Sequence, residues 1–282
     1  MSQSIAEAIL EATKTLRVAG LAEPRREAGS LLANVLGKDQ TFLITRAEIL
    51  LTAEQLSTFR QQVTRRAGGE PLQYITGFQE FFGLEFEVTR DALIPRPETE
   101  LLVETALGLM GDAPFICDIG TGTGCISVSL LHERPRARAI AVDISPNAAR
   151  LASRNAARND VDKRISLLVA DRFAAFHETQ TFDLIVSNPP YVIDRDWEGL
   201  QREVRDHEPR LALTSGSDGL TMIRRLIREA PAFLVTGGHL LMEIGYDQRV
   251  AVEQMIDPLF WKLVAIHNDL QGIPRTVVLR KL

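Results

Sequence analysis

The stretch Phe182-Asp183-Leu184-Ile185-Val186-Ser187-Asn188-Pro189-Pro190-Tyr191 combines an apolar run with a double proline. Residues 182–186 are typical of a short buried strand. Two consecutive prolines cannot continue a strand ladder, because neither has an N–H to donate. The strand therefore ends beside Asn188, at the carboxyl end where open α/β sheets bind their ligands.

The four residues from Asn188 to Tyr191 form a rigid set of hydrogen-bond acceptors beside an aromatic ring. Asn188 offers an amide oxygen, and Pro189 and Pro190 offer carbonyl groups without a competing N–H. Such a set suits a planar NH2 group, such as a carboxamide or the exocyclic amine of a base. A plain proline-rich turn that only ends a strand would explain the same four residues.

A second strand-to-turn transition lies earlier in the chain. The apolar run 115–119 ends at Gly120-Thr121-Gly122-Thr123-Gly124, and a buried helix is predicted directly after it. Glycines at this point let the backbone approach a ligand closely, and the helix N-terminus favours polar or anionic groups. The spacing is Gly-x-Gly-x-Gly, which differs from the Gly-x-Gly-x-x-Gly of dinucleotide folds.

Two further predicted strands end in polar residues. Strand 137–142 leads into Asp143, whose carboxylate can accept both hydroxyls of a ribose. The alternative for Asp143 is a structural acid before the helix that begins at Ser145-Pro146. Strand 165–169 leads into Asp171 and Arg172, which could contact an adenine. Because carboxyl ends of parallel strands share one edge, we expect all these residues to converge.

The remaining pattern completes an α/β fold. Helices are predicted over 218–230 and 248–255, and strands over 239–244, 262–267 and 276–280. Alternating strands and helices predict a doubly wound, mostly parallel, seven-stranded sheet. The last two strands have no helix between them, so we expect the final strand to insert antiparallel.

The first part of the chain is predicted to be helical. Residues 1–69 contain apolar residues at helical spacing, with starts expected near Ile5, Pro24 and Thr52. Residues 70–97 contain glycine and proline breakers and an alternating stretch around Leu84–Val88, which together indicate a linker with a β-hairpin. Residues 98–282 then form the cofactor-binding domain. The helical domain could dock a protein partner or could be a structural cap.

Composition narrows the class of protein. The chain has 282 residues and a net charge of -5, so it lacks the basic excess typical of nucleic-acid-binding proteins. Its two cysteines fit a reducing, cytoplasmic setting. The five histidines are scattered without the spacing of metal ligands, so we expect no metal. No apolar run approaches the ~20 residues needed to cross a membrane.

With these motifs in place, the chain resembles a known family. Asp118–Gly124 is similar to the first motif of class I S-adenosylmethionine-dependent methyltransferases, and Asn188–Tyr191 to the motif of those that methylate a planar nitrogen. The whole chain resembles the HemK/PrmC family of protein-glutamine methyltransferases. Further matching segments are Gly69–Gly77, Leu93–Glu100, Ala141–Asp143, Glu208–Leu213, Asp218–Leu220 and Glu243–Gly245.

The resemblance implies an activity, a cofactor and a partner. The reaction would be methyl transfer from S-adenosylmethionine, leaving S-adenosylhomocysteine, to the glutamine of the Gly-Gly-Gln motif of class 1 peptide-chain release factors. The helical domain would contact the release factor. A class I methyltransferase sheet, a cytoplasmic monomer, and no direct contact with nucleic acid or membrane are expected. The resemblance also puts Glu208-Pro209 near the substrate pocket.

The resemblance also assigns roles to residues of this chain. The cofactor-binding residues would be Gly120, Thr121, Gly122, Thr123 and Gly124 at the methionine part, Asp143 at the ribose, Asp171 and Arg172 at the adenine, and Asn188 beside the donor. Asn188, Pro189, Pro190 and Tyr191 would bind the substrate glutamine, with Asn188, Pro189 and Tyr191 as the catalytic set. Family members often have an aromatic residue where this chain has Arg172, so adenine stacking would fall to the guanidinium plane or to Phe173.

Three alternatives use the same sequence features. A sister enzyme could methylate a glutamine of a ribosomal protein with the same motif. An amino-methyltransferase could act on a base of DNA or RNA, but the negative net charge of the chain disfavours this alternative. A non-catalytic module could keep the fold alone, which the intact glycine turn, Asp143 and Asn188 disfavour.

Arg224, Arg225 and Arg228 are interpreted as a solvated helix face.

Overall fold

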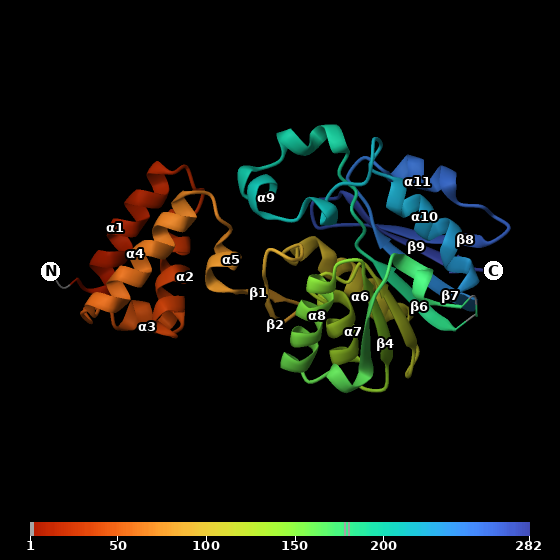
Figure 1. The fold of residues 1–282 in the computed structure, drawn as a ribbon, viewed down its shortest axis with the longest axis horizontal. Coiled ribbons are helices and arrows are strands. Elements are labelled where there is room, and N and C mark those ends of the chain that lie inside the picture. Colours follow the sequence, from red (N-terminus) through yellow and green to blue (C-terminus); the bar gives the residue numbers. More distant parts are fainter. Residues whose placement is uncertain (1–2, 178, 180) are drawn as a thin grey trace. The chain divides into compact units, whose positions relative to one another are not determined.

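The computed structural model of the chain describes residues 3–177, 179 and 181–282, which form two compact units (Figure 1). The first unit consists of the residues up to Gly77 together with Gln201–His207. The second consists of Phe78–Leu200 and Glu208–Leu282. Residues 1–2 of the predicted helical domain lie outside the described residues.

The first unit is helical, as the sequence predicts. Thr52 caps one helix through a reciprocal pair, in which its hydroxyl accepts from the Gln55 N–H at 3.1 Å and its own N–H donates to Gln55 Oε1 at 3.0 Å. Large buried side chains such as Leu31 and Phe59 form its separate core. Its helices are α1 (Ile5–Val18), α2 (Pro24–Leu36), α3 (Gln40–Thr45), α4 (Ala53–Ala67), α5 (Leu72–Thr76) and α9 (Arg202–His207).

Three of these helices were not predicted. α3, α5 and α9 have six, five and six residues, so none is long enough to show a clear helical period of apolar residues. α9 comes from the loop after the double proline, far along the chain from the other helices of its unit. Its Glu203 forms an ion pair at 3.0 Å with Arg66, whose side chain is nearly buried.

The stretch 70–97, predicted as a linker, contains α5 and a β-hairpin. Strands β1 (Phe78–Phe81) and β2 (Leu84–Glu87) pair antiparallel, which confirms the predicted hairpin. Phe81 and Phe86 are fully buried and meet edge to face, with ring centroids 6.1 Å apart. This aromatic pair anchors the hairpin to the second unit, to which both strands belong.

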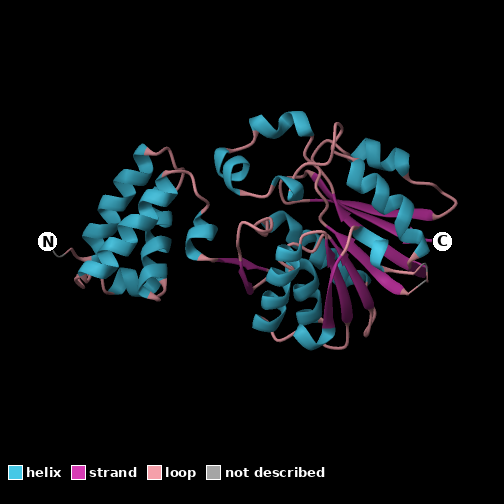
Figure 2. Cartoon of the chain, viewed as in Figure 1, coloured by secondary structure: helices cyan, strands magenta, loops and turns pink. Residues whose placement is uncertain are grey.

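The second unit is built on a seven-stranded sheet with the strand order β5-β4-β3-β6-β7-β9-β8 (Figure 2). β3 through β7 run parallel, and β9 lies antiparallel between β7 and β8, which confirms the predicted insertion. The strands are β3 (Phe115–Ile119), β4 (Arg138–Asp143), β5 (Ile165–Val169), β6 (Phe182–Ser187), β7 (Leu234–Glu243), β8 (Trp261–Asn268) and β9 (Pro274–Lys281).

Helices cover both faces of this sheet, so the predicted doubly wound fold is confirmed. Alternate residues of β3 show the two faces, because Ile116 packs in the core with α6 and α7 whereas Cys117 packs in the core with α10 and α11. The helices are α6 (Glu100–Leu109), α7 (Cys125–Glu133), α8 (Pro146–Arg158), α10 (Thr221–Glu229) and α11 (Arg249–Met255). Short 3-10 helices include η1 (Pro97–Thr99), which leads into α6, and η3 (Arg172–Ala175).

Two predicted boundaries were wrong. β7 begins at Leu234 and includes Gly237 and Gly238, which were expected to precede it. The strand tolerates them through a shift in its pairing with β6 between Phe182 and Leu184. The helix expected over 218–230 begins only at Thr221, because Gly219 has a φ of +71° that a helix cannot contain.

The strand order reverses between β3 and β6, whose neighbours lie on opposite sides. In open α/β sheets the cleft at such a point binds ligands. The glycine turn follows β3 and Asn188 follows β6, so both lie at this cleft. The fold therefore brings the two most informative motifs of the sequence to one edge.

The loop after Asn188 is held by a buried glutamine. Gln248 donates through Nε2 to the carbonyls of Tyr191 and Gly219, at 3.1 Å each, and accepts from the Gly245 N–H at 2.9 Å. A Cβ on Gly219 would lie 2.4 Å from the Tyr191 carbonyl oxygen. Glycine is therefore required where the 219 loop crosses the double-proline loop.

We expect Gly219→Ala to destabilise the second unit. The left-handed backbone alone costs a non-glycine residue about 1–2 kcal/mol, and the clash with the Tyr191 carbonyl adds to this. Gly108→Ala is the matched control, because Gly108 lies on α6 with open space around its Cβ position, and alanine there gains about 0.5–1 kcal/mol. Calorimetry should show opposite shifts of Tm, and equal shifts would contradict this crossing.

Candidate functional site

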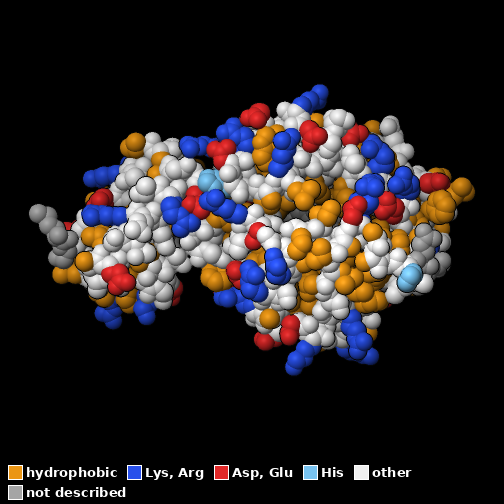
Figure 3. Space-filling view, in the orientation of Figure 1, with side chains coloured by type: hydrophobic (Ala, Val, Ile, Leu, Met, Phe, Trp, Pro, Cys, Tyr) orange, Lys and Arg blue, Asp and Glu red, His pale blue; other side chains and the backbone are white. Residues whose placement is uncertain are grey.

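The carboxyl edge of the sheet opens into a cavity of about 430 Å³. It is lined by the glycine turn, Asp143, Asp171, Arg172 and Asn188, so the four strand ends converge as predicted. Residues of segments 91–96 and 209–216 and three residues of α10 complete the wall. A hollow bordered by hydrophobic side chains is visible on this face of the second unit (Figure 3). A cavity of this size accommodates a small organic ligand.

The glycine turn needs its glycines for backbone conformation. Gly120, Gly122 and Gly124 have φ values of +75°, +56° and +82°, which other residues rarely adopt. Gly124 also caps α7, and a Cβ there would lie 3.2 Å from the Ala152 Cβ. Thr121 and Thr123 line the cavity between the glycines. Its N–H groups are mostly paired within the protein, because Gly120 and Thr121 donate to the Val142 carbonyl and Gly122 donates to Asp143. The turn thus presents its backbone surface and the start of α7 to the cavity.

Asp118, for which no role was predicted, supports this turn from the buried side. It is fully buried and accepts a hydrogen bond from the Thr121 hydroxyl at 2.7 Å through Oδ2. Its Oδ1 has no hydrogen-bond partner among the residues that the structure describes. Burial raises the pKa of Asp118 to about 6, although the Thr121 hydroxyl opposes the shift. The signal in the sequence is an acid at the buried end of a strand.

Asp143 has the structural role considered for it, and it also lines the cavity. Its Oδ2 accepts from the Gly122 N–H at 2.9 Å, and its Oδ1 accepts from the Ser145 N–H at 2.8 Å. The carboxylate therefore connects the glycine turn to the start of α8, where Ser145 is the N-cap. It also lines the cavity, and each oxygen keeps lone pairs for a ligand hydroxyl. Burial raises its pKa, while these backbone N–H groups oppose the shift.

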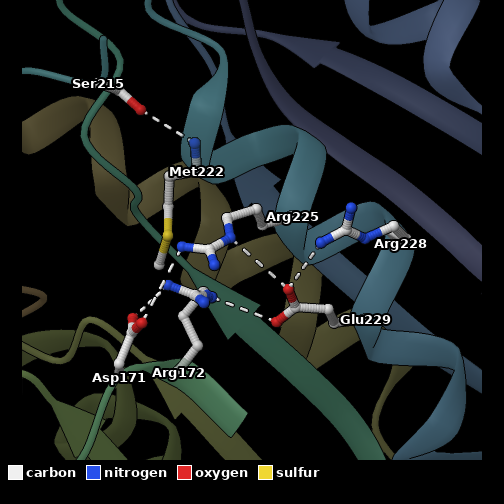
Figure 4. A network of polar contacts seen from close by, with 7 residues as sticks. All are labelled: Asp171, Arg172, Ser215, Met222, Arg225, Arg228 and Glu229. Atoms are coloured by element: carbon white, nitrogen blue, oxygen red, sulfur yellow. Dashed lines mark hydrogen bonds and ion pairs between the residues drawn. The ribbon is translucent and has the colours of Figure 1, made fainter. Parts of the chain in front are cut away.

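Arg172 lies in a network of charged side chains at one end of the cavity (Figure 4). Its guanidinium pairs with the neighbouring Asp171 and, at 3.2 Å, with Glu229 of α10. Arg225 is 3.7 Å from Glu229 and 4.0 Å from Asp171. Arg228 also contacts Glu229, at 3.3 Å. The two carboxylates thus hold two guanidinium groups at the cavity wall.

The structure distinguishes the two candidates for a stacking surface. The Phe173 ring is buried and stacks on Phe233, with centroids 4.5 Å apart, so it faces the core. Arg172 lines the cavity and has a left-handed backbone φ of +53°. Met222 and Arg225 of α10 line the same end (Figure 4). Arg225 was expected on a solvated helix face, but it also borders the cavity.

Two residues of the double-proline motif line the cavity, and the other two lie behind its wall. Asn188 and Pro190 line the cavity, whereas Pro189 is buried beside it. Tyr191 directs its hydroxyl to Glu243, at 3.2 Å. Burial and the Glu243 charge raise the pKa of Tyr191 well above its ordinary value. The Asn188 side chain donates through Nδ2 to the Thr99 hydroxyl at 3.0 Å.

The wall opposite the strand ends is held by Glu208. Its side chain is almost completely buried, accepts from the Ile94 N–H at 3.2 Å, and pairs with Arg96. Arg96 and Pro209 line the cavity. Glu208 therefore fixes the loop before α6 against the 209–216 segment, beside the cavity.

Several residues of the site carry no local signal in the sequence. Thr99, Met222 and Arg225 line the cavity from segments far along the chain from the strand ends. Only the three-dimensional arrangement brings them to the site. Within the described part of the chain, no cluster of three or more His, Cys, Asp or Glu could hold a metal ion. Likewise, no described helix is long and apolar enough to cross a membrane.

Comparisons with known proteins agree with this architecture. Residues 7–77 match the model of the PrmC N-terminal domain, and residues 97–205 match that of the methyltransferase small domain. Among solved structures, the catalytic domain of hMettl16 is similar with a TM-score of 0.57 at 15% identity, covering 83% of this chain and 84% of that one. A methyltransferase from Pyrococcus furiosus has a TM-score of 0.53 at 18% identity, covering 71% and 90%. These likenesses show the methyltransferase fold.

Curated relatives extend the similarity over the full chain. The release factor glutamine methyltransferase of Koribacter versatilis is 41% identical, with 99% of both chains covered. The protein with the same description from Cereibacter sphaeroides is 43% identical, with 98% of both chains covered. The chain therefore belongs to the family of release factor glutamine methyltransferases.

Proposed function

We propose that this chain transfers a methyl group from S-adenosylmethionine to the side-chain amide nitrogen of the glutamine in the Gly-Gly-Gln motif of class 1 peptide-chain release factors. The observation that carries the proposal is full-length similarity, at 41–43% identity, to proteins described as release factor glutamine methyltransferases. The acceptor set at Asn188 adds support, because it suits a carboxamide NH2 group.

The proposed donor fits the residues around the cavity. When bound, S-adenosylmethionine supplies an electrophilic methyl group on a positively charged sulfur. The glycine turn would hold its methionine part beside the start of α7, where the helix N-terminus favours the carboxylate. Asp143 would accept from the ribose hydroxyls, and Asp171 and Arg172 would flank the adenine. No residue in this assignment requires a metal.

The substrate assignment follows from amide chemistry. A carboxamide nitrogen is a poor nucleophile, because its lone pair is delocalised into the carbonyl. The side-chain oxygen of Asn188 and the carbonyl of Pro189 would accept the two N–H bonds of the glutamine. This would fix the direction of the nitrogen and favour the positive charge that develops on it. Tyr191 would pack near the amide plane.

Proton transfer does not need a dedicated base in this scheme. An amide nitrogen that has accepted a methyl group while keeping both protons is strongly acidic. It therefore loses a proton readily, and we assign that proton to water. The contribution expected of Asn188 and Pro189 is positioning, which can supply roughly 7–11 kcal/mol when the geometry is right.

The first unit would contact the release factor, with the enzyme acting as a cytoplasmic monomer. Its match to the PrmC N-terminal domain supports this assignment. A nucleic-acid substrate is disfavoured by the net charge of -5. Lys and Arg side chains are also interspersed with Asp and Glu on the visible face of each unit (Figure 3).

Mass spectrometry of a purified class 1 release factor after incubation with this protein and S-adenosylmethionine tests the proposal. We expect one added methyl group on the Gly-Gly-Gln glutamine, and none on a release factor carrying Ala at that position. Methylation of a ribosomal protein or an RNA offered separately, with the release factor unmodified, would overturn the substrate assignment.

Asn188→Ala tests the role of the acceptor set. Loss of one preorganised contact at the reacting group is expected to lower kcat by about 10²–10³-fold, while the Kd for S-adenosylmethionine changes less. Asn268→Ala, at the exposed end of β8, is the control for the substitution itself. Single-turnover assays and calorimetric titration give the two values, and a near-normal kcat would refute the role.

Arg172→Ala tests the adenine assignment. Loss of a guanidinium surface held by two carboxylates should raise the Kd for S-adenosylhomocysteine by about five- to thirtyfold. Arg172→Lys should show most of this loss, because lysine keeps the charge but lacks the plane. Arg228→Ala is the control, since Arg228 contacts the same Glu229 but does not line the cavity. Equal affinities for all variants would place the adenine elsewhere.

A further inference from the structure

A buried hydrogen-bond chain runs from the cavity into the second unit. Asn188 Nδ2 donates to Thr99 Oγ1 at 3.0 Å, and Thr99 Oγ1 donates to Glu243 Oε2 at 2.6 Å. The Tyr191 hydroxyl donates to the other oxygen, Oε1, at 3.2 Å. The chain therefore joins the loop after β6, the 3-10 helix η1 and the end of β7.

The carboxylate at the end of this chain determines its direction. An ionised carboxylate can only accept hydrogen bonds, so the single proton of the Thr99 hydroxyl must point to Glu243. The Thr99 oxygen can then only accept from Asn188, which must present its NH2 group to Thr99. The Asn188 side-chain oxygen is consequently left for the cavity.

The environment of Glu243 balances its burial against nearby charges. The residue is 2% exposed, and burial raises its pKa from the ordinary value, with a further contribution from Glu98. The hydroxyl donors of Thr99 and Tyr191 and the positive charge of Arg275 oppose this shift. Each carboxylate oxygen accepts a hydroxyl hydrogen bond, which favours the ionised form, and that form is lost as pH falls through the raised pKa.

We propose that Thr99 and Glu243 are positioning residues that fix the Asn188 amide with its oxygen toward the glutamine nitrogen. The reversed amide would present NH2 to NH2 and could not accept from the substrate. This inference rests on the proposed function. Two residues outside the double-proline motif then determine whether the Asn188 amide has its productive or its unproductive orientation.

Thr99→Val replaces the hydroxyl by a methyl group of similar size and removes the link. We expect kcat to fall by about ten- to a hundredfold, with the Kd for S-adenosylmethionine and the KM for the release factor within about threefold of the native values. Thr99→Ser, which restores the hydroxyl, should recover most of kcat. Thr105→Val is the control, because Thr105 donates only to a carbonyl of its own helix α6.

A double-mutant cycle separates positioning from a general structural role. If Thr99 acts through Asn188, Thr99→Val should lower kcat no further in an Asn188→Ala background. Additive losses, or a native kcat in Thr99→Val, would overturn the inference. Absence of methyl transfer by the native protein in the same assay would instead count against the proposed function.

A measurement that needs no substrate distinguishes failure of this inference from failure of the proposed function. The Nδ2 protons of Asn188 can be assigned by their loss from the NMR spectrum of Asn188→Ala. We expect their exchange with solvent to accelerate at least about tenfold in Thr99→Val and to remain slow in Thr99→Ser. Equal exchange in the native protein and Thr99→Val would show that Thr99 does not hold the amide.

Discussion

A proline nitrogen has no N–H to donate to a neighbouring strand, and the arrangement of the site depends on this constraint. Pro189 and Pro190 end β6 within one residue of Asn188, in the middle of a parallel sheet where a strand would otherwise continue. The chain must leave the sheet at the point where the strand order reverses. The acceptor groups of this loop therefore lie at the cleft by necessity, and their directions are set by a backbone with few alternatives.

A rigid loop in such a place must still satisfy the polar groups that it buries. Gln248 does this for the Tyr191 carbonyl, and Glu208 does it for the opposite loop at Ile94. Asp143 does the same for the glycine turn through its bond to the Gly122 N–H. Each of these side chains compensates a buried backbone group, which costs about 1–3 kcal/mol if left unpaired. The polar interior around the cavity thus serves mainly to hold loops in place.

The parts of this design that could be predicted from the sequence are those with a local cause. Strand ends at Gly120 and Asn188 follow from glycine and proline chemistry, and the common edge follows from the parallel order of the strands. Thr99 and Arg225 reach the cavity only through packing of distant segments, so no local pattern indicates them. α3 and α9 are too short to show a helical period, and their positions depend on tertiary packing.

The surroundings of Arg172 and Phe173 show how tertiary packing separates two side chains that residue type leaves equivalent. Both side chains could stack on an adenine, and they are adjacent in sequence. Arg172 lines the cavity, whereas the Phe173 ring packs in the aromatic cluster with Phe233. A guanidinium at a cavity wall also needs charges to hold its plane, and Asp171 and Glu229 supply them. The arginine thus depends on its acidic partners for the rigidity that an aromatic ring has by itself.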